Sequence, residues 1–126
     1  MRIHATCIDH VVLNVSDLDA SRRWWSTLIG ARATKDHEGE VSFKVGGQAL
    51  RLRQGVPAPR GSIGVCLLAD ASIRELYDRA EELHAVHGEV HPRTAATEPV
   101  QAITVEDPDG YQIELATYTP EGAPIP

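Results

Sequence analysis

The stretch EDPDGYQIEL, residues 106–115, decides the fold of this chain. Asp107-Pro108-Asp109-Gly110 is a turn sequence, because proline presets the turn backbone, aspartate bonds its own backbone and glycine accepts a positive φ. Alternating apolar and polar residues precede the turn at 100–106 and follow it at 111–117. The sequence therefore predicts a β-hairpin built around this turn.

Upstream of this hairpin, the sequence predicts the rest of one βαβββ unit. A strand is expected at 62–69, a helix opened by the capping box of Ser72 and Glu75, and a strand near 89–93. Gly88 is the expected stop of the helix. The helical spacing gives one apolar face, made of Ile73, Leu76, Tyr77, Ala80, Leu83 and His87.

The first half of the chain has the same order of elements. A strand at 7–15 leads to a helix capped by Ser16 or Asp17 and ended by Gly30. Three strands are expected around 31–35, 40–45 and 48–53, with Gly46-Gly47 as a turn.

The chain is therefore expected to form an α+β fold with two βαβββ repeats. We expect one domain over residues 1–126, with repeats at about 6–54 and 62–118 and a Pro- and Gly-rich linker at 55–61. The curved mixed sheets would form a cup, with the helices outside.

Composition excludes several classes of partner. A net charge of −6, a pI near 5.4 and scattered basic residues argue against a nucleic-acid surface. No apolar run approaches the roughly 20 residues that a membrane span needs, and no signal-peptide pattern opens the chain. Cys7 and Cys66 lack CxxC spacing, which suits a reducing compartment. We expect a cytoplasmic protein without nucleic-acid or membrane partners.

Strand alternation assigns residues to the two faces of each sheet. The set expected under the helices is Val11, Leu13, Val15, Leu50, Leu52, Ile63, Val65, Leu67, Tyr111, Ile113 and Leu115. The opposite set, which would line the cup, is His10, Val12, Asn14, Ala49, Arg51, Arg53, Ser62, Gly64, Cys66, Gln112, Glu114 and Ala116. Superposing the repeats pairs His10 with Ser62 and Arg51 with Glu114, which nominates four positions around one centre.

Three motifs together resemble the vicinal oxygen chelate superfamily over roughly residues 6–118. They are IDHVVLNVSDL at 8–18, Trp24-Trp25 with Leu28-Ile29-Gly30, and EDPDGYQIEL at 106–115. This superfamily includes glyoxalase I, bleomycin-resistance proteins and extradiol dioxygenases. The resemblance implies that His10 and Glu114 are metal ligands, half of a site for a divalent Ni, Co, Mn, Zn or Fe ion.

Two positions depart from the family pattern. Arg51 stands where glyoxalase I has a ligand, and Ser62 stands where glyoxalase I and the fosfomycin enzymes have histidine. A guanidinium does not deprotonate and repels cations, and a hydroxyl is a weak ligand. The cofactor is therefore either a divalent metal or none. Without metal, Glu114 has two readings, an ion pair with Arg51 or a general base.

Two functions remain open. The first is a lyase or isomerase of glyoxalase type, in which Glu114 or His10 moves a proton and Arg51 or a metal stabilises an enolate or oxyanion. This chemistry fits better than oxygen activation, because the two histidines and one carboxylate that hold Fe(II) in a dioxygenase are not visible. The second is a metal-free protein that sequesters a drug or natural product, as bleomycin-resistance proteins do; a pseudoenzyme is a third reading. Further binding residues would be Asn14, Arg53, Ser62 and Cys66, although a lone cysteine is usually a small core residue. The resemblance also implies a homodimer.

Overall fold

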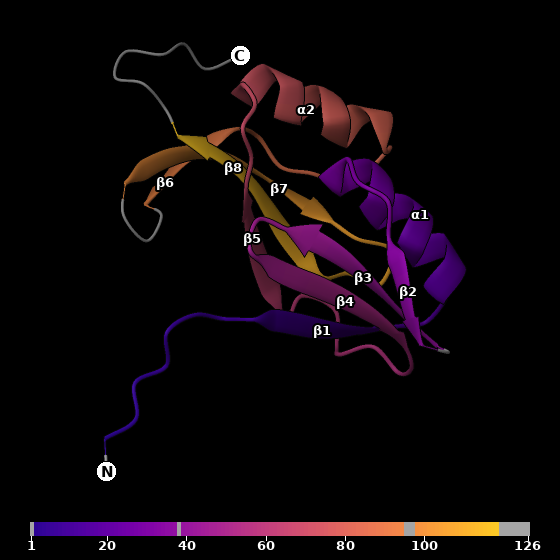
Figure 1. The fold of residues 1–126 in the computed structure, drawn as a ribbon. Coiled ribbons are helices and arrows are strands. Elements are labelled where there is room, and N and C mark those ends of the chain that lie inside the picture. Colours follow the sequence, from indigo (N-terminus) through magenta and orange to yellow (C-terminus); the bar gives the residue numbers. More distant parts are fainter. Residues whose placement is uncertain (1, 38, 95–97, 119–126) are drawn as a thin grey trace. The chain divides into compact units, whose positions relative to one another are not determined.

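The computed structural model describes residues 2–37, 39–94 and 98–118. The chain divides into two compact units, Met1–Ala58 and Pro59–Pro126, and each contains one sheet and one helix (Figure 1). The division falls inside the segment 55–61 that the sequence marks as a linker. No helix in these described ranges is both long enough and apolar enough to cross a membrane.

The first unit has the predicted βαβββ order. Its elements are β1 (His10–Val15), α1 (Leu18–Ile29), β2 (Thr34–His37), β3 (Glu40–Val45) and β4 (Gln48–Gln54). The sheet has the order β1-β4-β3-β2, in which β1 runs parallel to β4 and the other pairs are antiparallel.

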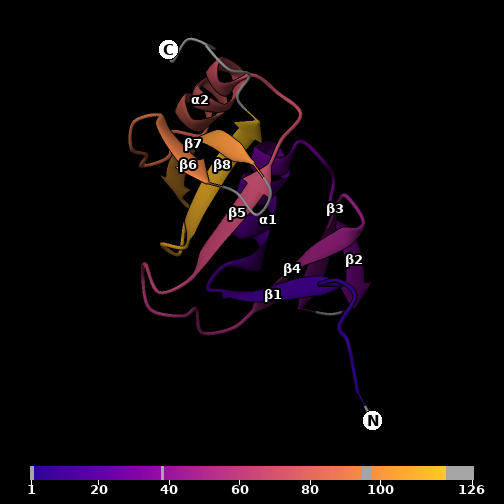
Figure 2. The same ribbon diagram turned by 90° about the vertical axis from the view of Figure 1, so that its left-hand side faces the viewer.

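The second unit repeats this arrangement. Its elements are β5 (Gly64–Leu68), α2 (Ile73–Glu82), β6 (His91–Thr94), β7 (Pro99–Glu106) and β8 (Gln112–Tyr118). The order β5-β8-β7-β6, with β5 parallel to β8, matches the first sheet strand for strand (Figure 2). The predicted α+β class and both βαβββ repeats are confirmed.

Each helix packs on the two middle strands of its own sheet, α1 on β3 and β4, and α2 on β7 and β8. Register brings apolar side chains to that side, and burying them is the main source of stability. The buried set is Leu13, Val15, Trp25, Leu28, Val41, Phe43, Leu50 and Leu52 in the first unit, and Ile73, Leu76, Ala80, Ile103, Val105, Tyr111, Ile113 and Leu115 in the second. We call the opposite side of each sheet its helix-free face.

The predicted hairpin forms around the turn at 107–110. The Asp107 carboxylate accepts hydrogen bonds from the backbone N–H groups of Asp109 (2.9 Å) and Tyr111 (2.8 Å), and Gly110 has a φ of +86°. Arg60 lies over this turn: a Cβ at position 110 would be 2.6 Å from its Cγ. The N–H of Gly61 also donates to the carbonyl of Gly110 at 3.0 Å. The end of the linker is thus fastened to the hairpin.

Both helices begin where the sequence predicts. The Asp17 side chain accepts from the N–H of Ala20, and Ser72 and Glu75 form a complete capping box. Gly30 ends α1 with a φ of +78°, as predicted. These caps satisfy N–H and C=O groups that a helix end leaves unpaired.

The predicted end of α2 is wrong. The helix stops at Glu82, and the left-handed residue that turns the chain is His84, with a φ of +51°, rather than Gly88. Its N–H donates to the carbonyl of Glu81, and the next N–H, that of Ala85, donates to Ala80, which is the bonding pattern of a Schellman motif. His87 therefore lies outside the helix and pairs with Val105 of β7.

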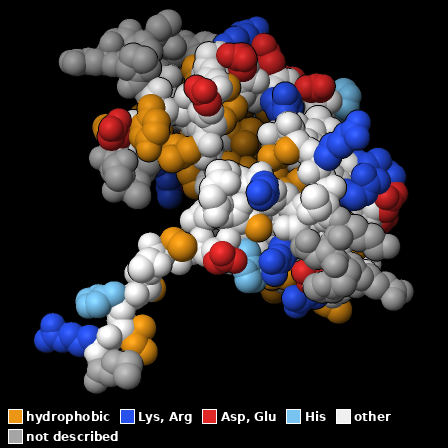
Figure 3. Space-filling view, in the orientation of Figure 1, with side chains coloured by type: hydrophobic (Ala, Val, Ile, Leu, Met, Phe, Trp, Pro, Cys, Tyr) orange, Lys and Arg blue, Asp and Glu red, His pale blue; other side chains and the backbone are white. Residues whose placement is uncertain are grey.

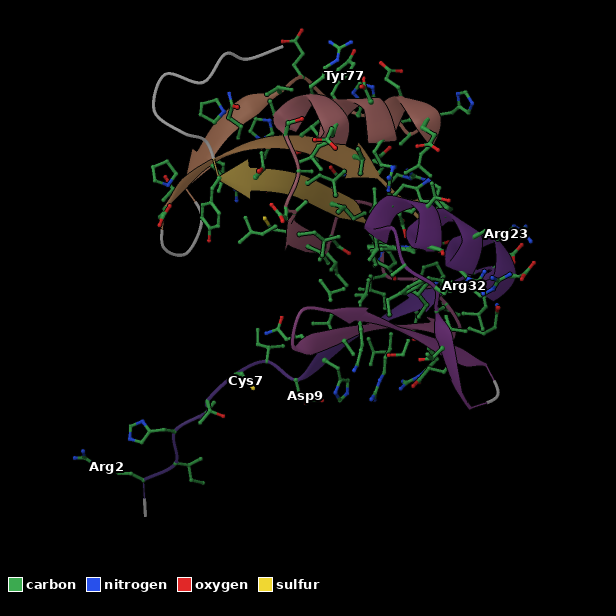
Figure 4. The ribbon with its side chains drawn as sticks, turned by 45° about the horizontal axis from the view of Figure 1, so that its top comes forward. Arg2, Cys7, Asp9, Arg23, Arg32 and Tyr77 are labelled. Carbon is green, nitrogen blue, oxygen red and sulfur yellow. The ribbon has the colours of Figure 1, made fainter. Side chains whose placement is uncertain are left out.

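Several strand boundaries also differ from prediction. The first strand begins at His10 rather than residue 7, and the second spans Thr34–His37 rather than 31–35. Residues 2–9 form an extended arm before β1 that carries the exposed Ile3 and Ile8 (Figure 3). Figure 4 shows Cys7 on this arm and Asp9 beside the start of β1.

The burial predicted for the two edge strands is only partly right. Val11 is 40% exposed, although Leu13 and Val15 are buried as predicted. In β5, Val65 and Leu67 are half-buried rather than buried. Both strands lie at a sheet edge, and the helices contact the middle strands, so the edge side chains are covered less well.

Candidate functional site

The helix-free face of the first sheet carries the predicted candidates of that unit. His10, Asn14, Arg51 and Arg53 all lie on it, because each is offset by one residue from the buried apolar set. Register places Arg51 between Val12 of β1 and Ser42 of β3. Arg51 is half-buried, and its Nε is shielded from solvent.

His10 is oriented by its neighbour in the chain. Its Nδ1 lies 2.9 Å from Oδ2 of Asp9, whose side chain is exposed. A carboxylate at one ring nitrogen fixes the ring and leaves Nε2 as the nitrogen that can accept a proton or ligand. Sequence reasoning found His10 but not the role of Asp9, which comes before the strand.

Arg53 is held by a carboxylate that sequence reasoning missed. Its Nε donates to Oε2 of Glu40 at 3.1 Å, and Glu40 is only 2% exposed. Register places Glu40 directly opposite Arg53, with Asn14 on the other side. The alternation of β3, with Val41 and Phe43 on the helix side, was the signal that could have found it. Arg53 is therefore held at Nε by Glu40, while 55% of its side chain stays exposed.

Glu114 lies at the centre of the helix-free face of the second sheet. Register places it between Cys66 of β5 and Thr104 of β7. Its side chain is 20% exposed, and Oε2 lies 2.9 Å from Nε of Arg93 on β6. The N–H of Arg93 is not aimed along this line, so the contact is an ion pair rather than a hydrogen bond.

Glu114 has an ion-pair partner within its own unit. Arg93 supplies the ion pair, and the sequence pattern did not single it out, because Arg93 was expected at the last position of a strand that actually continues to Thr94. Arg51 and Glu114 belong to different units, and the pairing predicted between them stays a prediction.

Cys66 is the third member of this cluster, beside Glu114. Burial raises the pKa of its thiol, the negative charge of Glu114 acts in the same direction, and Arg93 opposes both. A raised pKa keeps the sulfur protonated, and the thiol rather than thiolate form is a poor nucleophile. Cys66 is therefore a neutral lining residue of this face at physiological pH.

Ser62 does not lie where the sequence predicts it. β5 begins at Gly64, and Ser62 belongs to the turn before it. Its hydroxyl donates to the carbonyl of Pro59 at 2.6 Å, and its N–H bonds the same carbonyl. The expected cup-lining serine is a turn residue, because the linker end bonds to itself instead of joining the strand.

These side chains do not fit a resident divalent metal. Among the described side chains, those of residues 2–34, 39–94 and 98–118, no three His, Cys, Asp or Glu gather as a ligand set. Of the four nominated positions, Arg51 cannot ligate and the Ser62 hydroxyl is occupied. The carboxylate of Glu114 already faces a guanidinium, whose positive charge opposes a cation. Catalytic metal sites usually have three protein ligands, and here the chemistry supplies two at most.

Comparison with known proteins identifies the family. The model of the Glyoxalase/Bleomycin resistance protein/Dioxygenase superfamily matches residues 7–115. Virulence protein STM3117 of Salmonella typhimurium is 30% identical, with 88% of this chain and 83% of that protein covered. Glyoxalase domain-containing protein RDO1 of Mycosarcoma maydis is also 30% identical, with 88% of this chain and 68% of RDO1 covered.

Solved structures agree on the fold. The crystal structure of STM3117 superposes with a TM-score of 0.80 at 25% identity, over 93% of this chain and all of that one. An integron cassette protein from Vibrio cholerae gives a TM-score of 0.81 at 23% identity, over 94% of this chain and all of that one. The chain therefore belongs to the glyoxalase, bleomycin-resistance protein and dioxygenase superfamily.

Proposed function

We propose that this chain is a small-molecule lyase or isomerase that works without a resident metal, with Glu114 as the group that moves a proton. The observation that carries the proposal is the placement of Glu114. Its carboxylate is four-fifths buried at the centre of a helix-free face, with Oε2 beside Arg93 and Cys66 and Thr104 on either side. A mostly buried carboxylate on such a face is costly to keep unless a charged partner or a function retains it.

The proposed step is proton abstraction next to a carbonyl group. The C–H bond breaks, its proton passes to Glu114, and the electron pair moves to the carbonyl oxygen to form an enolate. The guanidinium of Arg93 supplies positive charge beside the reacting atoms. Return of the proton to another atom of the enolate completes an isomerisation. Arg51 and His10 stay candidates for a second charge and a second proton carrier.

Solvent exchange tests this proposal without knowledge of the natural substrate. The protein is incubated in D₂O with a panel of hydroxyketones, 2-oxoacids and hydroxyaldehydes, and NMR follows deuterium entering the carbon next to the carbonyl. We expect exchange above the buffer rate with at least one compound, and a loss of about 10²–10⁴-fold in Glu114→Gln.

Glu106→Gln is the matched control. Glu106 lies on the same face of the same sheet, its side chain is 25% exposed, and it also faces an arginine, Arg60, at 3.3 Å. Equal loss in both variants would show that the face needs its charge rather than a base at Glu114. No exchange with any compound would contradict the enzymatic proposal.

One observation favours a second function, the sequestration of an apolar molecule. Leu68 and Tyr118 are large, exposed apolar residues, and register places both on the helix-free face of the second sheet, near Ala116. Ligand binding measured by a thermal shift, without any deuterium exchange, would support this function instead.

A further inference from the structure

The closest contact between Arg93 and Glu114 uses Nε rather than a terminal amino group. The contact at 2.9 Å is made by Nε, and the exposed fraction of the Arg93 side chain is 57%. Among the described residues, no carboxylate other than that of Glu114 forms an ion pair with Arg93. Arginine presents its five N–H donors in a planar fork, and the closest contact with Glu114 does not involve the terminal pair.

The surface under Arg93 can support the aliphatic part of its side chain while the charged end stays accessible. Register places Arg93 opposite Val100 on β7, and Glu114 lies further along the neighbouring strand, so the side chain runs across the sheet. Val100, Ala102 and Ala116 form a buried cluster on this part of the face. Small apolar side chains leave room for the aliphatic stem of an arginine, which gains by covering them while its charged end stays accessible.

We infer that the terminal amino groups of Arg93 bind the carboxylate of a small organic acid, with Glu114 holding the guanidinium in place. This inference rests on the proposed function, since it brings the carbon that loses a proton, C2 of a 2-hydroxy acid or C3 of a 2-oxo acid, near the proposed base. The substrate class would be a 2-oxo or 2-hydroxy acid, whose carbonyl or hydroxyl oxygen is vicinal to the carboxylate.

Charge and shape favour a carboxylate over a phosphate. Arg93 and Glu114 together carry no net charge, so one added negative charge is tolerated better than the two of inorganic phosphate. A carboxylate is also planar and matches the fork with two parallel hydrogen bonds. Arg60 differs from Arg93, because one of its terminal amino groups, Nη1, already contacts Glu106 at 3.3 Å.

Titration of the full-length protein with lactate and pyruvate tests the inference. The signals of arginine N–H groups labelled with nitrogen-15 report binding, and lactamide serves as the uncharged analogue of lactate. We expect the Arg93 signal to shift with lactate or pyruvate at millimolar concentrations, and to shift much less with lactamide or inorganic phosphate.

Variants then assign the site. Arg93→Gln should weaken carboxylate binding at least tenfold, and Arg60→Gln should leave it unchanged. Arg60 is a matched control, since its exposed fraction of 62% and its glutamate partner resemble those of Arg93.

The outcomes separate this inference from the proposed function. Carboxylate binding at Arg93 without any exchange would retain the inference and reject the enzymatic proposal. Exchange confined to neutral ketones, with no shift of the Arg93 signal by lactate or pyruvate, would retain the enzymatic proposal and reject the inference. Equal effects of Arg93→Gln and Arg60→Gln, or phosphate binding tighter than either acid, would overturn the inference. If Arg93→Gln fails to fold, the signals of the wild-type arginines still decide it.

Discussion

The two units share a fold but differ on their helix-free faces. The first presents the basic groups Lys44, Arg51 and Arg53, with the buried Glu40 paired to Arg53. The second presents carboxylates, Glu106 and Glu114, beside a cluster of small apolar residues. The helix sides, in contrast, are apolar in both units. Packing under a helix limits those positions to apolar side chains, and the other face is left available for chemistry.

The helix sides differ in how they are filled. α1 inserts one large side chain, Trp25, which is fully buried and meets Trp24 edge to face. α2 buries the smaller Ile73, Leu76 and Ala80. Loss of the Trp25 side chain should therefore cost more stability than loss of any one side chain that α2 buries.

Replacement of Trp25 should have the largest effect on stability. Trp25→Ala removes a fully buried aromatic side chain and should lower the free energy of unfolding by about 3–5 kcal/mol, whereas Ala80→Gly should cost about 1 kcal/mol. Urea denaturation of both variants checks this order. Equal costs would show that the two helices anchor their sheets in the same way.

The ends of the two helices provide the next comparison. Both place a residue in left-handed conformation, Gly30 after α1 and His84 after α2. Because a side chain is strained there, His84→Gly should stabilise the protein by about 0.5–1 kcal/mol and Gly30→Ala should destabilise it by about 1 kcal/mol. Thermal unfolding measures both shifts. A destabilising His84→Gly would mean that the imidazole makes contacts worth more than the strain.

The charge cluster of the second face can be examined through Cys66. Glu114 raises the pKa of this thiol and Arg93 lowers it. Glu114→Gln should therefore yield more thiolate at a given pH and faster alkylation by iodoacetamide, and Arg93→Gln should slow it. Cys7, on the exposed arm, is the internal control in each protein. Changes of the same sign in both variants would contradict the arrangement of the three groups.

The smallest expected effect concerns the capping box of α2. Hydrogen bonds from the backbone and hydroxyl of Ser72 lower the pKa of Glu75. Because the pKa of Glu75 is lower in the folded state, its ionisation stabilises the folded protein at any pH above the pKa that Glu75 has in the unfolded chain. This contribution is lost as the pH falls through the pKa of the folded state. The melting temperature of the wild type should therefore fall relative to Glu75→Gln in acid. A difference that stays constant with pH would exclude this linkage.

Periodicity predicted the parts of the fold that packing and turn chemistry specify. The bounds of β3 and the hairpin turn at 107–110 follow from alternation and from proline, aspartate and glycine in their usual positions. The end of α2 could not be predicted this way, because a histidine seldom adopts the left-handed backbone found at His84.

The candidate site was predicted less completely than the fold. Alternation placed His10, Arg51 and Glu114 on the correct face, because in each of their strands the residues that point to the other face are apolar. It missed Arg93 and Glu40, whose importance depends on register with neighbouring strands. Register comes from pairing between segments far apart in the chain, which a local pattern does not contain.

The packing of Arg60 over Gly110 restricts which amino acids position 110 can accept. Every amino acid that one base change can make from a glycine codon carries a side chain. At position 110 that side chain would strain a backbone with a φ of +86° and displace Arg60, whose Cγ would be 2.6 Å from the new Cβ. Aspartate, which tolerates this backbone better than most residues, would still collide with Arg60. Every amino-acid substitution at Gly110 should therefore be destabilising. We expect only synonymous codon changes at this position.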